Sequence, residues 1–178
     1  IEAHSPFLSR AEWQANSTPQ KVQPGTACYA GLDLSASRDL TALVLVFPKD
    51  ETFDVVPYFW LPEEGLRDKA KTEKVPWDIW AEQGYLTTIP GPVINPEVIA
   101  RAVAEIADTY DLKLLAFDRW RINDFKRSLD TIGAEIPMQP HGQGFRDMAP
   151  AVDNLERMVA ERKLCHGDNP ILNMCAAG

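Results

Sequence analysis

Two aspartates stand at the ends of strand-like apolar segments in this sequence. Asp33 lies near the end of segment 27–34, and Asp118 is the last residue of segment 112–118. If the two segments are parallel neighbours in one sheet, the carboxylates converge at the edge where α/β sheets bind their ligands. Two carboxylates held so near to each other repel one another unless a cation lies between them. Hard oxygen ligands without a suitable His or Cys cluster favour Mg²⁺ or Mn²⁺ over Zn²⁺.

Divalent ions held by such carboxylates predict a particular reaction. Two ions about 4 Å apart can activate water and stabilise the leaving oxygen during phosphodiester hydrolysis. We therefore expect Asp33 and Asp118 to be catalytic metal ligands. The alternative is structural, because an aspartate at a strand end is often a turn former or a helix cap.

Two further acids are weaker candidates for the same metal site. Asp39 closes the turn 35–39, and Asp168 ends the sequence His166-Gly167-Asp168. An ordinary polar hairpin explains Asp39 equally well. A turn before a helix cap at Asn169 explains Asp168 equally well.

Arginines near these segments predict contacts with DNA phosphates. Two of them flank Trp120 directly after Asp118. Planar guanidinium groups pair well with phosphates, and an indole can stack on a base or sugar, although Trp120 could equally belong to the core. Another lies in the turn 35–39, whose backbone amides could also bind phosphate. The expected DNA-binding residues are Arg38, Arg119, Arg121 and Arg146.

The elements that must position these residues begin with a meander. Apolar, β-rich segments follow one another at 27–34, 40–47 and 52–60. A helix capped by Asn95 then leads to the apolar segment 112–118, which predicts a buried parallel strand reached through a helical crossover. This element order is that of the ribonuclease H fold, in which the first and fourth strands lie side by side.

The rest of the sequence completes the expected fold. A helix at 122–132 is ended by Gly133, and 135–139 is a plausible last strand. The fold class is therefore α/β, ribonuclease H-like, with a mixed five-stranded sheet flanked by helices. Further helices are expected within 63–74, from Pro76, along the apolar stripe from Met148 to Val159, and from Asn169-Pro170.

The first 26 residues differ in character from the remainder. They carry scattered prolines and polar residues without a sustained period, which predicts a linker or an arm from a preceding domain. One short helix within 7–13, capped by Ser9, is the exception. We place the folded domain at 27–178, and 178 residues suffice for one domain with its own core.

Bulk properties set limits on partners and location. The net charge of −8 argues against a general nucleic-acid coat, but acids gathered around a metal ion would reverse the local field. The longest apolar stretch, 40–47, is far too short to cross a membrane. Three cysteines without CxxC spacing indicate neither a disulfide framework nor a zinc site, which fits the cytoplasm.

Several short motifs, in order, resemble the nuclease domain of large terminase subunits from tailed bacteriophages and prophages. They are Gly31-Leu32-Asp33-Leu34-Ser35, Asp39-Leu40-Thr41-Ala42-Leu43, Tyr58-Phe59-Trp60-Leu61-Pro62, Phe117-Asp118-Arg119-Trp120, Gln143-Gly144-Phe145 and His166-Gly167-Asp168-Asn169-Pro170. The resemblance implies an endonuclease that cuts concatemeric double-stranded DNA in the host cytoplasm. It also implies an ATPase domain in the same protein, and a portal and a small terminase subunit as partners. No GxxxxGK[ST] motif occurs, so the motor half lies outside this chain.

The family pattern includes a third acid in a late helix, beyond the Asn-Pro segment. Here no acid follows Asp168 before Gly178. We therefore expect the nuclease domain to be truncated at its C-terminus, the third metal ligand to lie beyond Gly178, and the fragment to cut weakly or not at all.

Two other readings of the sequence remain open. The domain could be a docking module of the packaging motor whose acids are structural. Less favoured is an actin-like or sugar-kinase-like phosphate-binding domain, which needs a second glycine-rich hairpin. Arg119 and Trp120 stand where that hairpin would follow Asp118.

Overall fold

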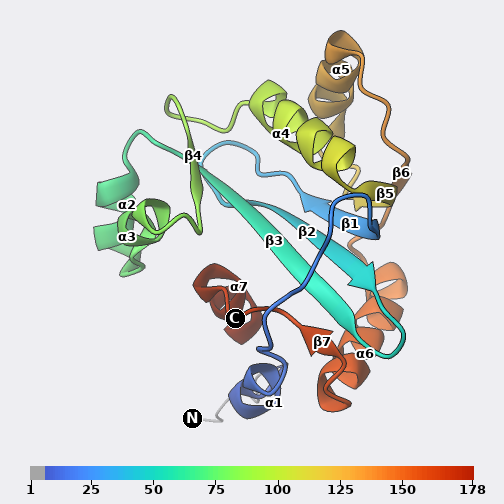
Figure 1. The fold of residues 1–178 in the computed structure, drawn as a ribbon. Coiled ribbons are helices and arrows are strands. Elements are labelled where there is room, and N and C mark those ends of the chain that lie inside the picture. Colours follow the sequence, from blue (N-terminus) through green and yellow to red (C-terminus); the bar gives the residue numbers. More distant parts are fainter. Residues whose placement is uncertain (1–6) are drawn as a thin grey trace.

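The first three strands form the expected antiparallel meander at the heart of the sheet (Figure 1). The structure is a computed structural model that describes residues 7–178. β1 (Ala27–Asp33) pairs with β2 (Thr41–Pro48), which pairs with β3 (Phe53–Pro62). Buried residues alternate along β1 and β2, because successive side chains of a strand point to opposite faces.

A helical crossover then brings the fourth long element back beside β1. The side chain of Asn95 accepts a hydrogen bond from the backbone of Glu97, and α4 (Pro96–Thr109) begins there, as expected. β5 (Asp111–Phe117) follows and pairs with β1 in parallel, with Leu32 opposite Phe117. The prediction that the first and fourth strands are neighbours is therefore confirmed.

The chain next adds a strand on the far side of β5. α5 (Ile122–Ile132) ends at Gly133, which has the left-handed conformation expected of a C-terminal glycine. β6 (Met138–Pro140) then pairs with β5 in parallel, with Phe117 opposite Pro140. The loops that leave β1, β5 and β6 consequently emerge at the same edge of the sheet.

Helices cover both faces of the sheet. α4 and α5 pack on one face, where Leu43, Leu45 and Phe47 meet Ile99, Val103 and Phe125. α6 (Phe145–Ala160) and α7 (Pro170–Ala177) contribute Val159 and Ile171 to the smaller clusters on the opposite face. The layers are visible in Figure 1, with α4 and α5 above the sheet and α6 and α7 below it.

The described part of the chain has seven strands, where the sequence predicted five. β4 (Thr87–Ile89) lies parallel to the end of β3, after the helices α2 (Leu66–Glu73) and α3 (Trp77–Glu82). β7 (Leu164–Cys165) lies parallel to the start of β3. Both extra strands are too short to show an alternating pattern in the sequence. The five predicted strands therefore form the central part of the larger observed sheet.

The N-terminal segment packs onto this sheet instead of standing apart from it. α1 (Arg10–Gln14) begins at Ser9, whose hydroxyl accepts the backbone hydrogen bond of Glu12. Leu8 and Trp13 are buried, and the Trp13 ring stacks on His166 with 4.2 Å between ring centroids. We call residues 8–26 the N-terminal strap. The packed domain therefore extends N-terminally beyond the expected start at Ala27, while residues 1–6 of the expected arm lie outside the described residues.

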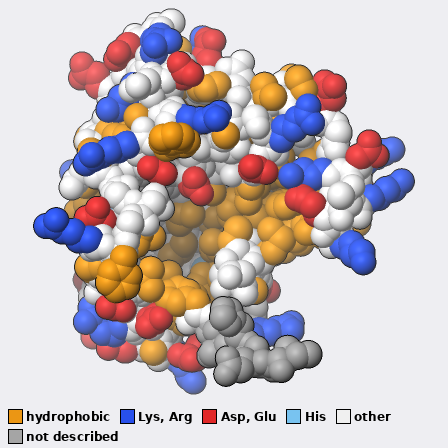
Figure 2. All heavy atoms as spheres, turned by 180° about the vertical axis from the view of Figure 1, so that it is seen from behind, with side chains coloured by type: hydrophobic (Ala, Val, Ile, Leu, Met, Phe, Trp, Pro, Cys, Tyr) orange, Lys and Arg blue, Asp and Glu red, His pale blue; other side chains and the backbone are white. Residues whose placement is uncertain are grey.

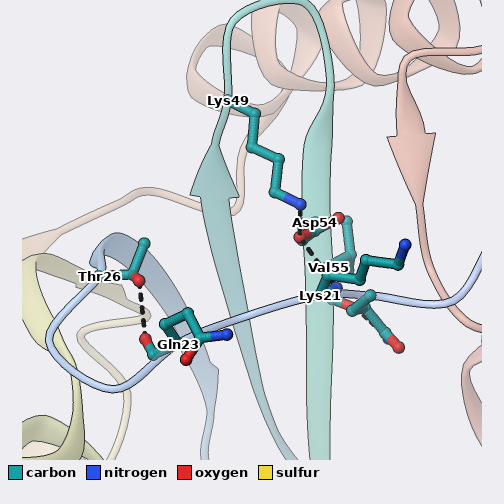
Figure 3. A network of polar contacts seen from close by, with 7 residues as sticks. Lys21, Gln23, Thr26, Lys49, Asp54 and Val55 are labelled. Atoms are coloured by element: carbon teal, nitrogen blue, oxygen red, sulfur yellow. Dashed lines mark hydrogen bonds and ion pairs between the residues drawn. The ribbon is translucent and has the colours of Figure 1, made fainter.

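Polar contacts hold the strap along β3 (Figure 3). The backbone N–H of Lys21 donates to the buried carboxylate of Asp54, which also forms a 2.6 Å ion pair with Lys49. Gln20 donates to the backbone carbonyls of Val55 and His166. None of the helices in residues 7–178 has the length and apolarity that crossing a bilayer requires.

Candidate functional site

Asp33 and Asp118 lie at adjoining strand ends. Asp33 is the last residue of β1, and Asp118 follows the last residue of β5. One step beyond the pair Leu32 and Phe117, the parallel register sets the two aspartates opposite each other. Because side chains alternate along a strand, both acids share the sheet face of Gly31 and Ala116.

The two carboxylates are close enough for the charge of Asp118 to affect the ionisation of Asp33. Partial burial raises the pKa of Asp33 above its usual value, and the negative charge of Asp118 adds to the rise. A positive ion between them would relieve both effects. Hard carboxylate oxygens in this arrangement fit a divalent cation such as Mg²⁺ or Mn²⁺. Within residues 7–178, no group of three His, Cys, Asp or Glu side chains is arranged to hold a metal.

The acids stand at the end of an open hollow of about 370 Å³. Its floor is made of small residues of β1, β2 and β5, among them Gly31, Ala42 and Ala116. Met148 and Ala151 of α6 also line it. Seen from behind, the molecule has a hollow lined by hydrophobic side chains, with acidic side chains near its edge (Figure 2).

The loop after β6 also lines this hollow. His141 and Gln143 are among the lining residues, and the backbone N–H of His141 donates to the carbonyl of Phe117 at 2.8 Å. Sequence reasoning gave no role to His141. A glycine-rich loop after the last predicted strand was the available signal, because loops after parallel strands meet at one edge.

The C-terminal part of α7 lies in the neighbourhood of Asp33. The pKa of the Cys175 thiol is raised by burial and, secondarily, by the charge of Asp33. Cys175 thus lies near enough to Asp33 to be influenced by it. Sequence reasoning predicted α7 but not this position, because nothing local shows over which strand end a helix lies.

The segment after Asp118 holds its arginines in a fixed turn. The backbone N–H of Trp120 donates to Oδ1 of Asp118 at 3.2 Å. Arg121 adopts a left-handed conformation, with φ of 61°, and its Nη1 donates to the carbonyl of Ala36 at 2.9 Å. Arg119 is exposed beside it, and so is Arg146 in the first turn of α6. Arg119 and Arg121 therefore lie on the loop that leaves β5, and Arg146 lies at the start of α6, after the loop that leaves β6.

Two backbone amides of the turn 35–39 already have acceptors within the turn and its flanking strand. The backbone N–H of Ser35 donates to Thr41, and that of Ser37 donates to the hydroxyl of Ser35. These contacts favour the ordinary polar hairpin. Arg38 lines a different hollow, with Glu64 and Asp68 beside α2, so the structure does not bring it to the hollow of the acid pair. Asp39 is exposed in the turn and does not line that hollow either.

His166 and Asp168 have structural partners. The backbone N–H of Asp168 donates to Nδ1 of His166, so Nε2 carries the ring proton and donates to the carbonyl of Trp13 at 2.8 Å. Oδ1 of Asp168 accepts a hydrogen bond from Asn173 at 2.8 Å. These contacts favour a turn before α7, which is the alternative that the sequence left open.

Comparison with known proteins identifies relatives of the whole chain. Residues 2–176 match the family described as "Terminase large subunit, endonuclease domain". The large terminase subunit of Enterobacteria phage HK97 is 43% identical over 182 residues, which cover 99% of this chain and 35% of that protein. The chain thus spans about a third of the length of that relative.

Solved structures agree with this comparison. The crystal structure of the HK97 bacteriophage large terminase matches with a TM-score of 0.89 and 43% identity over 97% of this chain and 36% of that one. The large terminase nuclease of thermophilic phage G20c, solved with bound magnesium, matches with a TM-score of 0.60 and 12% identity over 96% of this chain and 78% of that one. The second match shows the shared ribonuclease H-like fold. By its sequence and fold, this chain belongs to the endonuclease-domain family of terminase large subunits.

Proposed function

We propose that this chain is a metal-dependent endonuclease domain that hydrolyses phosphodiester bonds of concatemeric double-stranded DNA during phage DNA packaging. The observation that carries the proposal is the acid pair. Asp33 and Asp118 end adjoining parallel strands, and the pKa of Asp33 is raised by burial first and then by the charge of Asp118. A structural role alone does not account for two carboxylates held where they repel each other.

Asp33 and Asp118 would hold the metal ions through their carboxylate oxygens. Mg²⁺ or Mn²⁺, two ions in the complete site, would supply water activation and stabilisation of the leaving oxygen. The nuclease of phage G20c has been solved with bound magnesium and also with bound zinc, which supports a divalent ion of some kind at the equivalent domain.

The arginines would bind the DNA backbone around the acids. Arg119 and Arg121 follow Asp118, and Arg146 lies in the first turn of α6, just after the loop that leaves β6. Guanidinium groups match phosphate geometry and remain charged at every relevant pH. Since Arg121 is already bonded to Ala36, its main contribution is to fix the turn that presents Arg119.

The remaining metal ligand and the partners belong to the whole protein. We propose that the third acid of the family pattern lies beyond Gly178. A fragment with two of three acids would bind metal weakly and cut DNA poorly. An ATPase domain in the same protein, a portal, a small terminase subunit and the host cytoplasm complete the proposed setting.

The test is a nicking assay on supercoiled plasmid DNA with Mn²⁺. The chain is compared with a version extended at its C-terminus, each also as Asp33→Asn and as Asp118→Asn. We expect the extended protein to nick strongly and each substitution to lower its rate by about a hundredfold or more, since a metal ligand is lost. Manganese-dependent nicking that survives both substitutions would overturn the assignment and favour a docking domain. Asp168→Asn is the matched control and should leave nicking unchanged.

A further inference from the structure

Two large aromatic side chains are exposed just after the strands beside the acid pair, Trp120 in the turn after β5 and Phe145 at the start of α6. The side chain of Trp120 is 74% exposed and that of Phe145 is 89% exposed. They are the two most exposed large hydrophobic side chains of the described residues: Phe7, Tyr29 and Tyr85 are 41–49% exposed, whereas Trp13, Trp60 and Trp77 are at most 7% exposed. Exposing an indole and a phenyl ring forgoes the stabilisation that their burial gives. The fold itself therefore does not explain these two positions.

The strand register brings the two loops together. Phe117 of β5 lies opposite Pro140 of β6, so the segments that begin at Asp118 and His141 leave the sheet side by side. Trp120 belongs to the first segment, and Phe145 follows the second. Both aromatics thus follow, by a few residues, strand ends at the edge of the sheet where Asp118 lies.

Backbone contacts hold Trp120 in its outward position. Its N–H donates to the carboxylate of Asp118, which links it directly to the acid pair. Arg121, the next residue, adopts a left-handed conformation that is uncommon for residues other than glycine, and its bond to Ala36 secures that conformation. The chain thus keeps a less favourable turn that leaves the indole in solvent.

The surroundings of the two rings match a nucleic acid. Arg119 and Arg121 flank Trp120, and Arg146 follows Phe145, although the chain as a whole carries a net charge of −8. Positive groups next to exposed aromatics bind the phosphates and bases of unpaired strands, because every base has a face on which a ring can stack. Bases in an intact duplex do not offer that face.

We propose that Trp120 and Phe145 stack on unpaired bases of the strand that passes the acid pair. The preferred substrate is then a duplex that is locally opened at the cutting position. This inference rests on the proposed nuclease function for its purpose, but DNA binding can be measured without cleavage.

The experiment compares two labelled probes by fluorescence anisotropy in EDTA, so that no metal-dependent cleavage alters them. One is a fully paired duplex, and the other has the same length with a central unpaired bubble. We expect the wild-type chain to bind the bubble about tenfold more tightly or better, which is the range that stacking supplies. Trp120→Ala and Phe145→Ala should each lose most of that preference, whereas Trp120→Phe should retain part of it.

A fluorescent purine analogue placed in the bubble separates stacking from charge. Its emission should be quenched by the wild-type chain and not by Trp120→Ala, while Arg119→Gln should weaken binding to both probes alike. Ile79→Ala, at a half-exposed residue of α3, is the matched control and should behave as wild type. Both aromatic variants should unfold at the wild-type temperature, since their side chains are exposed.

Equal affinity of the wild-type chain for the two probes would overturn the proposal. So would a bubble preference that persists in the Trp120→Ala, Phe145→Ala double variant, which would leave the rings for a protein partner. Neither result depends on nicking. A failure of the stacking proposal is therefore distinguishable from a failure of the nuclease assignment.

Discussion

At the scale of single residues, the site depends on two negative charges held close together. The pKa of Asp33 is raised first by burial and then by the charge of Asp118. Replacing Asp118 with Asn removes the second cause and leaves the first. We therefore expect the pKa of Asp33 to fall in Asp118→Asn, though not fully to its usual value, as measured by carbon NMR titration of the carboxyl group. Asp124→Asn, at an exposed residue of α5, is the control.

The same shift has a consequence for stability. The folded pKa of Asp33 is higher than the unfolded one, so the free energy of unfolding falls as the pH rises through the interval between them. Above that pH interval, the loss of stability caused by the charged Asp33 carboxylate has reached its full size. Asp33→Asn should thus stabilise the chain at neutral pH, by less than about 1 kcal/mol for so exposed a group, and the gain should vanish in acid. Urea unfolding at both pH values measures it, and an equal gain at both would contradict the repulsion.

The positions of some site residues could be predicted from the sequence and those of others could not, for physical reasons. Asp33 and Asp118 could be paired in advance, because parallel neighbouring strands end at one edge of a sheet. Arg38 could not be placed, because its turn is bonded through Ser37 to the backbone of Ile94 and faces α2. Contacts of that kind join segments far apart in the sequence and leave no periodic signal. The same holds for Cys175.

At the scale of elements, the N-terminal strap is tied to the sheet and to α6 through one buried side chain. Asn16 is 1% exposed, and its Nδ2 donates to the carbonyls of Glu12 and Val159. Its Oδ1 accepts the backbone N–H of Leu164 in β7. Every polar group of the amide that faces the interior therefore has a partner.

Asn16→Asp keeps the shape of this side chain and reverses the polarity of one end. A carboxylate oxygen would face the carbonyls of Glu12 and Val159, which repel it, and a charge would be buried without a counter-ion. We expect the free energy of unfolding to fall by about 2–4 kcal/mol, measured with urea at neutral pH. Asn154→Asp, at an exposed residue of α6 beside Arg157, is the matched control and should change it little. A loss as small as the control's would show that the strap does not depend on this amide.

Long elements were predictable, and the strap and the two short strands were not. Apolar, β-rich composition marked β1 and β2, and cap residues marked α4 and α7, because these signals are local. β4 and β7 exist because β3 is long enough to pair with them at both ends. The strap, with its prolines and polar residues, has the composition of a linker. Its burial comes from Trp13 stacking on His166, a residue that follows 153 positions later.

At the scale of the whole molecule, an acidic protein is proposed to act on an acidic polymer. The net charge of −8 opposes DNA binding, so local positive charge must come from arginines and from bound metal. Metal binding should also be visible in the stability of the whole domain. A ligand that binds only the folded state stabilises it in proportion to the logarithm of its concentration relative to its dissociation constant.

Mn²⁺ should therefore raise the melting temperature of the chain through the acid pair. At ten times the dissociation constant the gain is about 1.4 kcal/mol, or roughly 3–5 °C for a domain of this size. Part of any rise in melting temperature would come from ions that gather around an acidic surface. The Asp33 and Asp118 variants therefore show how much of the rise comes from binding at the acid pair. Asp33→Asn and Asp118→Asn should lose most of it, whereas Asp168→Asn should keep it, because Asp168 is bonded to Asn173 and His166. A chain extended beyond Gly178 should reach the same shift at lower Mn²⁺, since a third acid would tighten binding. If the shift is instead lost in Asp168→Asn and kept in Asp33→Asn, the metal lies at the start of α7, and the acid pair is structural.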